Sequence, residues 1–132
     1  MITTSQTELT ITEMLDLAYA RGYAAGMADS DGSLVHASGH STRAGAKIAI
    51  VFSQTHRGVL EILQQHLVTL GMASHLTGPH EQANRNPMYR LKVTEQSDIL
   101  KFLREVGFRQ FRRAARAENY LRGRPLTLGD GA

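Results

Sequence analysis

Apolar residues recur at helical spacing in some segments of this chain and alternate with polar residues in others. A repeat of three to four residues predicts a helix that buries one face, and strict alternation predicts a half-buried strand. The pattern predicts a helix at 10–29, strands at 33–38 and 46–54, a helix at 57–70, strands at 72–77 and 87–94, and helices at 98–106 and 109–121. The predicted order is therefore αββαββαα.

Local signals support these boundaries. Thr10 is followed three residues later by Glu13, which is the capping-box pattern of a helix start. Gly32 is expected to end the first helix, as glycine often does. Alternation in the second strand places Ile48, Ile50 and Phe52 together on one face. The turn-rich segment 78–87, GPHEQANRNP, is expected to be the loop that joins the second pair of strands.

Length and composition limit the class of protein. A chain of 132 residues with 42% hydrophobic content can form one compact core and is too short for two ordinary domains. It has no cysteine, which excludes disulfides and thiolate zinc sites and favours a reducing, intracellular setting, either cytoplasm and nucleoid or an organelle matrix. The N-terminus has no signal-peptide pattern, and we expect a soluble, unprocessed protein without membrane contact.

Charge is distributed unevenly along the chain. Residues 1–84 carry four basic and seven acidic side chains, whereas residues 85–132 carry eleven basic and five acidic ones. The segment RQFRRAARAENYLRGR at 109–124 is the most basic part. Such a cluster is typical of a protein that binds a polyanion, but a solvated helix face gives the same pattern. Charge alone leaves both interpretations open.

Two acidic residues, Asp29 and Asp31, stand where the first helix ends. The carbonyl end of a helix carries partial negative charge, so each acid there is unfavourable by a few tenths to about 1 kcal/mol unless another group compensates. Carboxylates and carbonyl oxygens without thiolates form a site for a hard divalent cation such as Mg²⁺. The sequence therefore suggests a cation at this helix end.

The same helix carries a row of small residues. Ala18, Gly22 and Gly26 recur every four residues, and Ala25 lies beside the last of them. Glycine within a helix costs about 1 kcal/mol relative to alanine, but it lets another backbone approach closely. The row either packs against the chain's own sheet or meets the same row of a second copy. In the second case, a twofold axis would bring two copies of Asp31 together.

The segment AAGMADSDG at 24–32 resembles the signature of the LAGLIDADG homing endonucleases, and it departs from the consensus letters at Ala24, Met27, Ala28 and Ser30. The order of elements, the strand ending FSQ before a leucine-rich helix, and the basic segment FRQFRRAARAE extend the resemblance over about residues 12–121. The resemblance implies an α+β fold of αββαββα order, with helices on one face of a saddle-shaped antiparallel sheet. It divides the chain into an N-terminal arm at 1–11, the endonuclease domain at 12–122 and a flexible tail at 123–132.

The resemblance also implies an active site. It makes Asp31 the metal ligand, next to the backbone carbonyl of Ser30, and gives Asp29 a supporting or capping role. Gln54 falls where the family places a polar residue that orders water, although an exposed amide at a strand end would look the same. Arg112 matches the basic residue near the scissile phosphate, and a shift of one residue would assign this role to Arg113. His56 or Arg57 could assist from the following helix.

In the family, the sheet lies along the major groove of DNA, and its free face reads bases. The residues expected to contact DNA are Lys47, Ser53, Arg57, Arg90, Lys92 and Arg113. The strand positions that would face DNA are otherwise poor in base-reading side chains: Val35, Ala37, Ala49, Val51 and Leu76. Either the facing is shifted by one residue, which would expose His36, Ser38 and His75, or the target is read through thymine methyls, the DNA backbone and DNA shape.

Two other metal sites are rejected. An EF-hand that starts at Asp29 would need glycine at its sixth position and glutamate at its twelfth, where the chain has Leu34 and His40. The six histidines are scattered and lack acidic or thiolate partners at zinc-ligand spacing.

The resemblance therefore implies a site-specific, double-strand DNA endonuclease connected with intron or intein mobility. A single motif copy implies a homodimer formed through Ala18, Gly22, Ala25 and Gly26, with Mg²⁺ or Mn²⁺ as cofactor and a pseudo-palindromic DNA target. The alternative is a binding module of the same fold, either an intron RNA maturase or a transcription regulator. A third class is a dimeric scaffold that binds nucleic acid without sequence preference.

Overall fold

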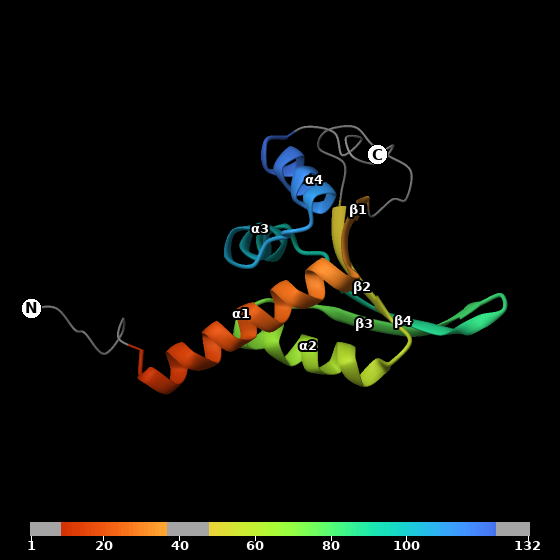
Figure 1. Cartoon of the computed structure of the whole chain (residues 1–132), viewed down its shortest axis with the longest axis horizontal. Helices are drawn as coiled ribbons and strands as arrows, with labels where there is room; N and C mark the ends of the chain where they lie inside the picture. The colour runs from red at the N-terminus through yellow and green to blue at the C-terminus, as the bar shows by residue number, and fades with distance from the viewer. Residues whose placement is uncertain (1–8, 37–47, 124–132) are drawn as a thin grey trace, which may run out of the picture.

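The computed structural model describes residues 9–36 and 48–123. Within this part, the order of elements is the predicted αββαββαα (Figure 1). The elements are α1 (Ile11–Asp31), β1 (Gly32–His36), β2 (Ile48–Gln54), α2 (Arg57–Thr69), β3 (His75–Gln82), β4 (Arg85–Val93), α3 (Gln96–Glu105) and α4 (Phe111–Leu121). Residues 1–8 and 124–132 hold most of the expected arm and tail, and they lie outside the described residues.

The four strands form one antiparallel sheet in the order β1-β2-β4-β3. In Figure 1, α1 and α2 lie side by side along one face of this sheet, and the β3–β4 hairpin projects beyond them. Phe102 of α3 packs edge-on against Phe52 of β2, with 5.9 Å between ring centroids, so α3 covers the same face. The predicted α+β fold, with helices on one face of an open antiparallel sheet, is confirmed.

The core lies between the sheet and these helices. Ile48, Ile50 and Phe52 are all buried, as the alternation in β2 predicts. The helices and the other central strand contribute mainly small and branched aliphatic side chains: Ala20, Ala24, Ala28, Leu60, Leu63, Leu67, Leu91, Val93 and Ile99. Because α1 buries only alanines, its backbone can lie close to the sheet and to α2.

The start of α1 has the predicted capping box. The Thr10 side chain accepts a hydrogen bond from the Glu13 backbone N–H, and the Glu13 carboxylate accepts one from the Thr10 backbone N–H, both at 3.0 Å. The bond from the Thr10 backbone is the main reason why the pKa of Glu13 lies below its usual range. Among the described helices, none has the length and apolar character needed to cross a membrane.

The second hairpin is longer than the sequence pattern predicts. Most of the segment expected to be the loop 78–87 is strand, because β3 runs to Gln82 and β4 begins at Arg85. The turn between them is short, and Asn84 adopts a left-handed conformation with φ of 58°. The Gly78–Pro79 segment, which suggested a loop, lies at an irregularity of the strand pairing between Thr77 and His80.

Candidate active site

Asp31 and Gln54 meet at the junction of helix and sheet. Asp31 is the last residue of α1 and Gln54 the last of β2, and the antiparallel pairing of Gly32 with Phe52 brings these two ends together. Gln54 Nε2 donates a hydrogen bond of 2.7 Å to Asp31 Oδ2. Both side chains are half-buried. The two residues assigned to the site from the sequence are therefore direct neighbours.

Gly32 lets the strand turn sharply away from the helix. A Cβ at Gly32 would lie 2.9 Å from Ala28 Cα and 3.0 Å from Phe52 Cε2, both too close for a side chain. Gly32 is the C-cap of α1, so the prediction that it ends the helix is confirmed, and its backbone is extended, with φ of −90°. The last helical residue is Asp31, and the close approach of Phe52 in β2 requires a glycine at position 32.

Ser30 supplies a backbone carbonyl beside Asp31. Its side-chain hydroxyl donates to the backbone carbonyls of Gly26 (3.1 Å) and Met27 (3.3 Å) and so lies along the helix. The Ser30 carbonyl belongs to the last turn of α1, where backbone oxygens lack partners further along the helix. The arrangement therefore places carboxylate and carbonyl oxygens together at the end of α1.

Asp29 holds the start of α4. Its Oδ1 accepts hydrogen bonds from the backbone N–H groups of Arg109 (2.7 Å) and Gln110 (3.1 Å). The bond from Arg109 is the main reason why the pKa of Asp29 is lowered. An ionised carboxylate is favourable at a helix N-terminus, which carries partial positive charge. Asp29 is thus occupied by α4, in keeping with a capping role.

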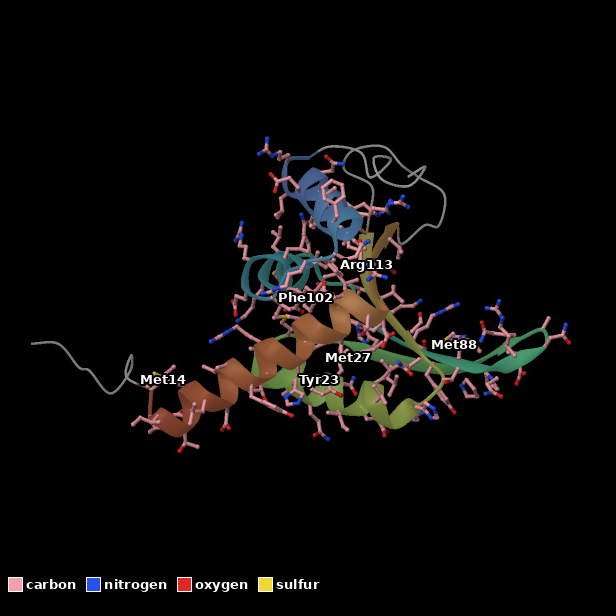
Figure 2. All side chains as sticks on the ribbon, viewed as in Figure 1. Met14, Tyr23, Met27, Met88, Phe102 and Arg113 are labelled. Carbon is pink, nitrogen blue, oxygen red and sulfur yellow. The ribbon has the colours of Figure 1, made fainter. Side chains whose placement is uncertain are left out.

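Two arginines of α4 bind the backbone on either side of Asp31. Arg113 donates to the backbone carbonyl of Asp29, and Figure 2 shows its side chain between α4 and the end of α1. The half-buried Arg116 donates twice to the carbonyl of Leu34 in β1, at 2.9 and 3.2 Å, and burial lowers its pKa. Arg112 is exposed and has no hydrogen-bond or ion-pair partner within 9–36 and 48–123. Arg113, rather than Arg112, contacts the motif helix.

Arg57 and His56 follow Gln54 and Thr55 closely. Arg57 forms an exposed ion pair with Glu61 on the next turn of α2, at 3.2 Å, and its guanidinium lies 5.9 Å from the Tyr89 ring centroid. His56 is the N-cap of α2 and makes no capping bond with its side chain. Exposed ion pairs of this kind contribute little to stability, so Arg57 can exchange Glu61 for another anion.

The sheet face that points away from the helices is the expected DNA surface. Ser53 pairs with Arg90, and Val51 pairs with Lys92, so these residues form two rows across the central strands. Val35 and Val51 are half-buried and alternate with buried residues, which agrees with the assigned facing, whereas Ala49 has the same alternation but is buried. In β3 the facing is shifted by one residue from the assigned one, because Leu76 packs against the core and His75 is exposed. Lys47, Ala37 and Ser38 lie outside the described residues.

The small-residue row of α1 lies on the surface. Ala18, Gly22 and Gly26 are exposed, and a Cβ added at either glycine would meet nothing within 4 Å. Packing of this row against the chain's own sheet is therefore wrong, because Ala20, Ala24 and Ala28 take that place. The exposed row continues toward the helix start in Leu15 and Ile11, which are 64% and 73% exposed. Ala25 is half-buried beside it.

Polar residues that the sequence pattern assigned to a loop form a concave surface near the β3–β4 turn. It has a volume of about 700 Å³ and is lined by Thr55, Gln82, Asn84, Arg85, Asn86 and Met88. Glycine and proline in this segment predict a loop, and a loop prediction does not bring these side chains together on one surface. The only sequence signal for them is the density of amide side chains between Gln82 and Asn86.

A metal would find oxygen ligands here but not a full set. Residues 9–36 and 48–123 hold no cluster of three or more histidine, cysteine, aspartate or glutamate side chains. Asp31 and the carbonyl of Ser30 are hard oxygen donors of the type that Mg²⁺ prefers. Mg²⁺ usually keeps several waters and binds through one or two carboxylates together with substrate phosphates. Asp31 and the Ser30 carbonyl therefore fit a Mg²⁺ ion whose remaining ligands are waters and substrate phosphates.

The sequence matches the family model of the LAGLIDADG-like domain over residues 18–107. This match covers more than half of the chain, and the protein belongs to this family. The resemblance noted from the motif at 24–32 is thereby confirmed. A search of curated protein sequences found no match.

Solved structures show the same fold. One of them is the homing endonuclease I-CvuI in complex with the I-CreI target in 2 mM Mg, with the DNA not cleaved. Its TM-score is 0.54 and its sequence identity is 15%, and the match covers 86% of this chain and 68% of that chain. An archaeal intron-encoded homing endonuclease, I-Vdi141I complexed with DNA, has a TM-score of 0.50 and 22% sequence identity. This match covers 80% of this chain and 71% of that chain. I-CvuI in complex with its target (Sro1.3) in 2 mM Ca has a TM-score of 0.53 and 14% sequence identity, and the match covers 83% of this chain and 67% of that chain.

Proposed function

We propose that this protein is a homodimeric, divalent-metal-dependent endonuclease that cuts both strands of a specific DNA site. The observation that carries the proposal is the junction at the end of α1, where Asp31 is held by Gln54 at 2.7 Å beside an exposed small-residue row. A protein that only binds nucleic acid has no need for an acid at the carbonyl end of a helix, where it is unfavourable.

The exposed row of α1 supports the dimer. Ala18, Gly22 and Gly26 offer a surface without long side chains, on which the same helix of a second copy could pack closely. Glycine is unfavourable within a helix, and the monomer does not use the space at either glycine. A twofold contact of this kind would bring two Asp31 carboxylates near the axis, so that each copy completes the other's metal site.

Within that dimer, the residues of each chain have distinct roles. Asp31 and the Ser30 carbonyl would hold Mg²⁺, for which Mn²⁺ could substitute. When bound, the metal would lower the pKa of water and stabilise the leaving oxygen. Gln54 donates to Asp31 through its NH₂ group, which leaves its amide oxygen to accept a hydrogen bond from the attacking water. The exposed side chains of Arg112 and Arg57 would contact phosphate from α4 and α2.

The remaining contacts would come from the free face of the sheet. Arg90 and Lys92 project from it, with Ser53 beside Arg90, and α4 adds Arg113 at its edge. Basic side chains hold the phosphates and fix the position of the protein on the duplex. The DNA complexes of I-CvuI and I-Vdi141I, which share the fold, support DNA as the partner.

The decisive experiment compares the wild type with Asp31→Asn on DNA sites selected by the wild type. The substituted amide keeps an oxygen that can accept the bond from Gln54, so the fold should be retained. In Mg²⁺ the wild type should make double-strand cuts, and the variant should lose several orders of magnitude in cleavage rate but still bind. In Ca²⁺ both should bind without cutting. Asp16→Asn, an exposed acid on the same helix, is the matched control and should cut like the wild type.

Other results would identify the alternatives. A wild type that binds a selected site tightly but never cuts it in Mg²⁺ or Mn²⁺ would be a binding module, either a maturase or a regulator. A wild type that binds without any sequence preference would be a nucleic-acid scaffold. Either result would refute the endonuclease proposal.

A further inference from the structure

The backbone on both sides of Asp31 is bonded to side chains of α4. Arg113 donates a hydrogen bond to the backbone carbonyl of Asp29 at the end of α1. Arg116 donates two hydrogen bonds to the backbone carbonyl of Leu34 in β1, at 2.9 and 3.2 Å. The two arginines are three positions apart and so lie on the same side of α4. Their two bonded carbonyls enclose the stretch that carries the proposed metal ligand.

The sheet supports this stretch from one side only. β1 is an edge strand and pairs with β2, and α4 lies beside β1 (Figure 1). Asp31 is followed by Gly32, which has no side chain to restrict its backbone. Within 9–36 and 48–123, the Asp31 carboxylate accepts one hydrogen bond, from Gln54. The bonds from α4 therefore add support that neither the sheet nor Gln54 supplies.

The placement of Arg116 suits this task better than it suits phosphate binding. Its side chain is half-buried, whereas Arg112 on the same helix is exposed. Burial of a charged group is costly unless the group is hydrogen-bonded, and two N–H groups of Arg116 are bonded to the Leu34 carbonyl. A contact with DNA phosphate requires no such burial.

We propose that Arg116, together with Arg113, is a positioning residue that sets where the Asp31 carboxylate lies in the proposed metal site. The inference rests on the proposed binding of a divalent cation by Asp31. Mg²⁺ demands near-ideal octahedral geometry, with ligand distances of about 2.0–2.1 Å, so a small displacement of this carboxylate weakens cation binding. Residues that hold a metal ligand in place without touching the metal typically contribute about 10- to 100-fold to metal affinity or activity.

A positioning role and a role of charge alone predict opposite effects on the cation. The positive charge of Arg116 repels a divalent cation, so its removal should tighten cation binding if only the charge matters. Loss of the bonds to Leu34 should weaken cation binding if the position of Asp31 matters. A merely structural role would lower the Tm and leave the cation affinity unchanged. The cation affinity therefore distinguishes the three roles.

The test is calorimetric titration of Ca²⁺ into the full chain bound to a DNA duplex that the wild type selects. Arg116→Met keeps an apolar stem and removes both the charge and the donors, whereas Arg116→Lys keeps the charge and loses the planar pair of donors. Arg122→Met, at an exposed position just after α4, is the matched control for lost charge. Ile99→Val, which removes a buried methylene group from α3, is the control for lost stability.

Arg116→Met should raise the Kd for Ca²⁺ about 10- to 100-fold, and the Mg²⁺ concentration for half-maximal cleavage should rise with it. Arg116→Lys should lie between Arg116→Met and the wild type, and both controls should keep the wild-type Kd. Wild-type or tighter Ca²⁺ binding by Arg116→Met overturns the inference.

If Arg116→Met does not fold, Arg113→Met decides, because it removes the bond to the Asp29 carbonyl on the other side of Asp31. A raised Kd for Ca²⁺ supports the inference, and an unchanged Kd overturns it. A wild-type complex that binds no Ca²⁺ and is not cut in Mg²⁺ would refute the proposed function, and the inference with it. When the wild type binds Ca²⁺ and cuts in Mg²⁺, a failure of the variants refutes the inference alone.

Discussion

Replacing Asp29 with alanine removes the carboxylate that attaches the start of α4 to the end of α1. In the wild type, Asp29 Oδ1 accepts the backbone N–H groups of Arg109 and Gln110 at 2.7 and 3.1 Å. Without it, these two donors at the beginning of α4 lose their protein partner. We expect α4 to open more often, because the substitution removes a cap from this helix while its apolar contacts remain.

The size of the effect follows from two opposing contributions. Loss of a carboxylate cap at a helix N-terminus costs about 0.5–2 kcal/mol. Removal of an acid from the carbonyl end of α1 is favourable by about 0.3–1 kcal/mol. The pKa of Asp29 lies below its usual range, so the ionised form is favoured in the folded state and the first contribution is the larger one. We expect a net loss of about 1 kcal/mol, which lowers the Tm by roughly 3–5 °C for a domain of this size.

Thermal melting followed by circular dichroism measures the change in Tm, and amide hydrogen exchange locates it. Exchange should become faster in Phe111–Leu121 and stay unchanged in the central strands. Asp29→Asn keeps an oxygen acceptor but loses the charge, and it should give an intermediate effect. Asp16→Ala, which removes an exposed acid from the same helix, is the control and should match the wild type. If Asp29→Ala leaves both the Tm and the exchange of α4 unchanged, the role assigned to this carboxylate is wrong.

Three further predictions concern the dimer, the basic helix and the DNA contacts. Gly26→Leu should give a folded monomer in sedimentation, because a single chain has open space at this position. In a close helix–helix contact, the larger side chain would cost about 1–3 kcal/mol through overpacking. A wild type that is monomeric at micromolar concentration, alone and with DNA, would contradict the proposed twofold-symmetric site. Arg112→Ala should lower the cleavage rate more than the affinity for DNA. Arg113→Ala should also lower the Tm, because Arg113 donates a hydrogen bond to the Asp29 carbonyl. If Arg112→Ala has the cleavage rate and affinity of the wild type, the basic segment 109–124 is only a solvated helix face. Log affinity for DNA should fall with log salt by about 0.9 for each phosphate contacted, and a flat salt dependence would contradict phosphate binding.

Periodicity and end signals were sufficient to predict the order of elements, because each helix or strand here has a strong local pattern. The capping box of α1 and the buried row of β2 depend on neighbouring residues only, and both are present. Helical periodicity does not decide which apolar side chains face the core: in α2, Ile62 is 48% exposed, whereas Leu60 is buried. Several apolar residues lie next to each other in α2, and tertiary packing alone decides which of them face the sheet.

The hairpin and the contacts of α4 could not be predicted for a different reason. In β3, the irregularity near Gly78 and Pro79 accommodates residues that normally interrupt a strand, so local turn signals were misleading. The bonds from Arg109 and Gln110 to Asp29 join residues about 80 positions apart, and no spacing rule reports such a contact. The motif identified the residues around Asp31, but only the tertiary structure shows how α4 is attached to them.

The structure separates the two acids that end the motif helix. Both are unfavourable beside the carbonyl groups of α1, and each must be compensated. Asp29 is compensated within the chain, by two backbone N–H groups of the α4 region and by Arg113 on its own carbonyl. Asp31 has a bond from the neutral amide of Gln54, which brings no charge to offset its own. In the proposed function, a cation would offset the negative charge of Asp31, whereas the contacts with the α4 region account for Asp29 without a metal.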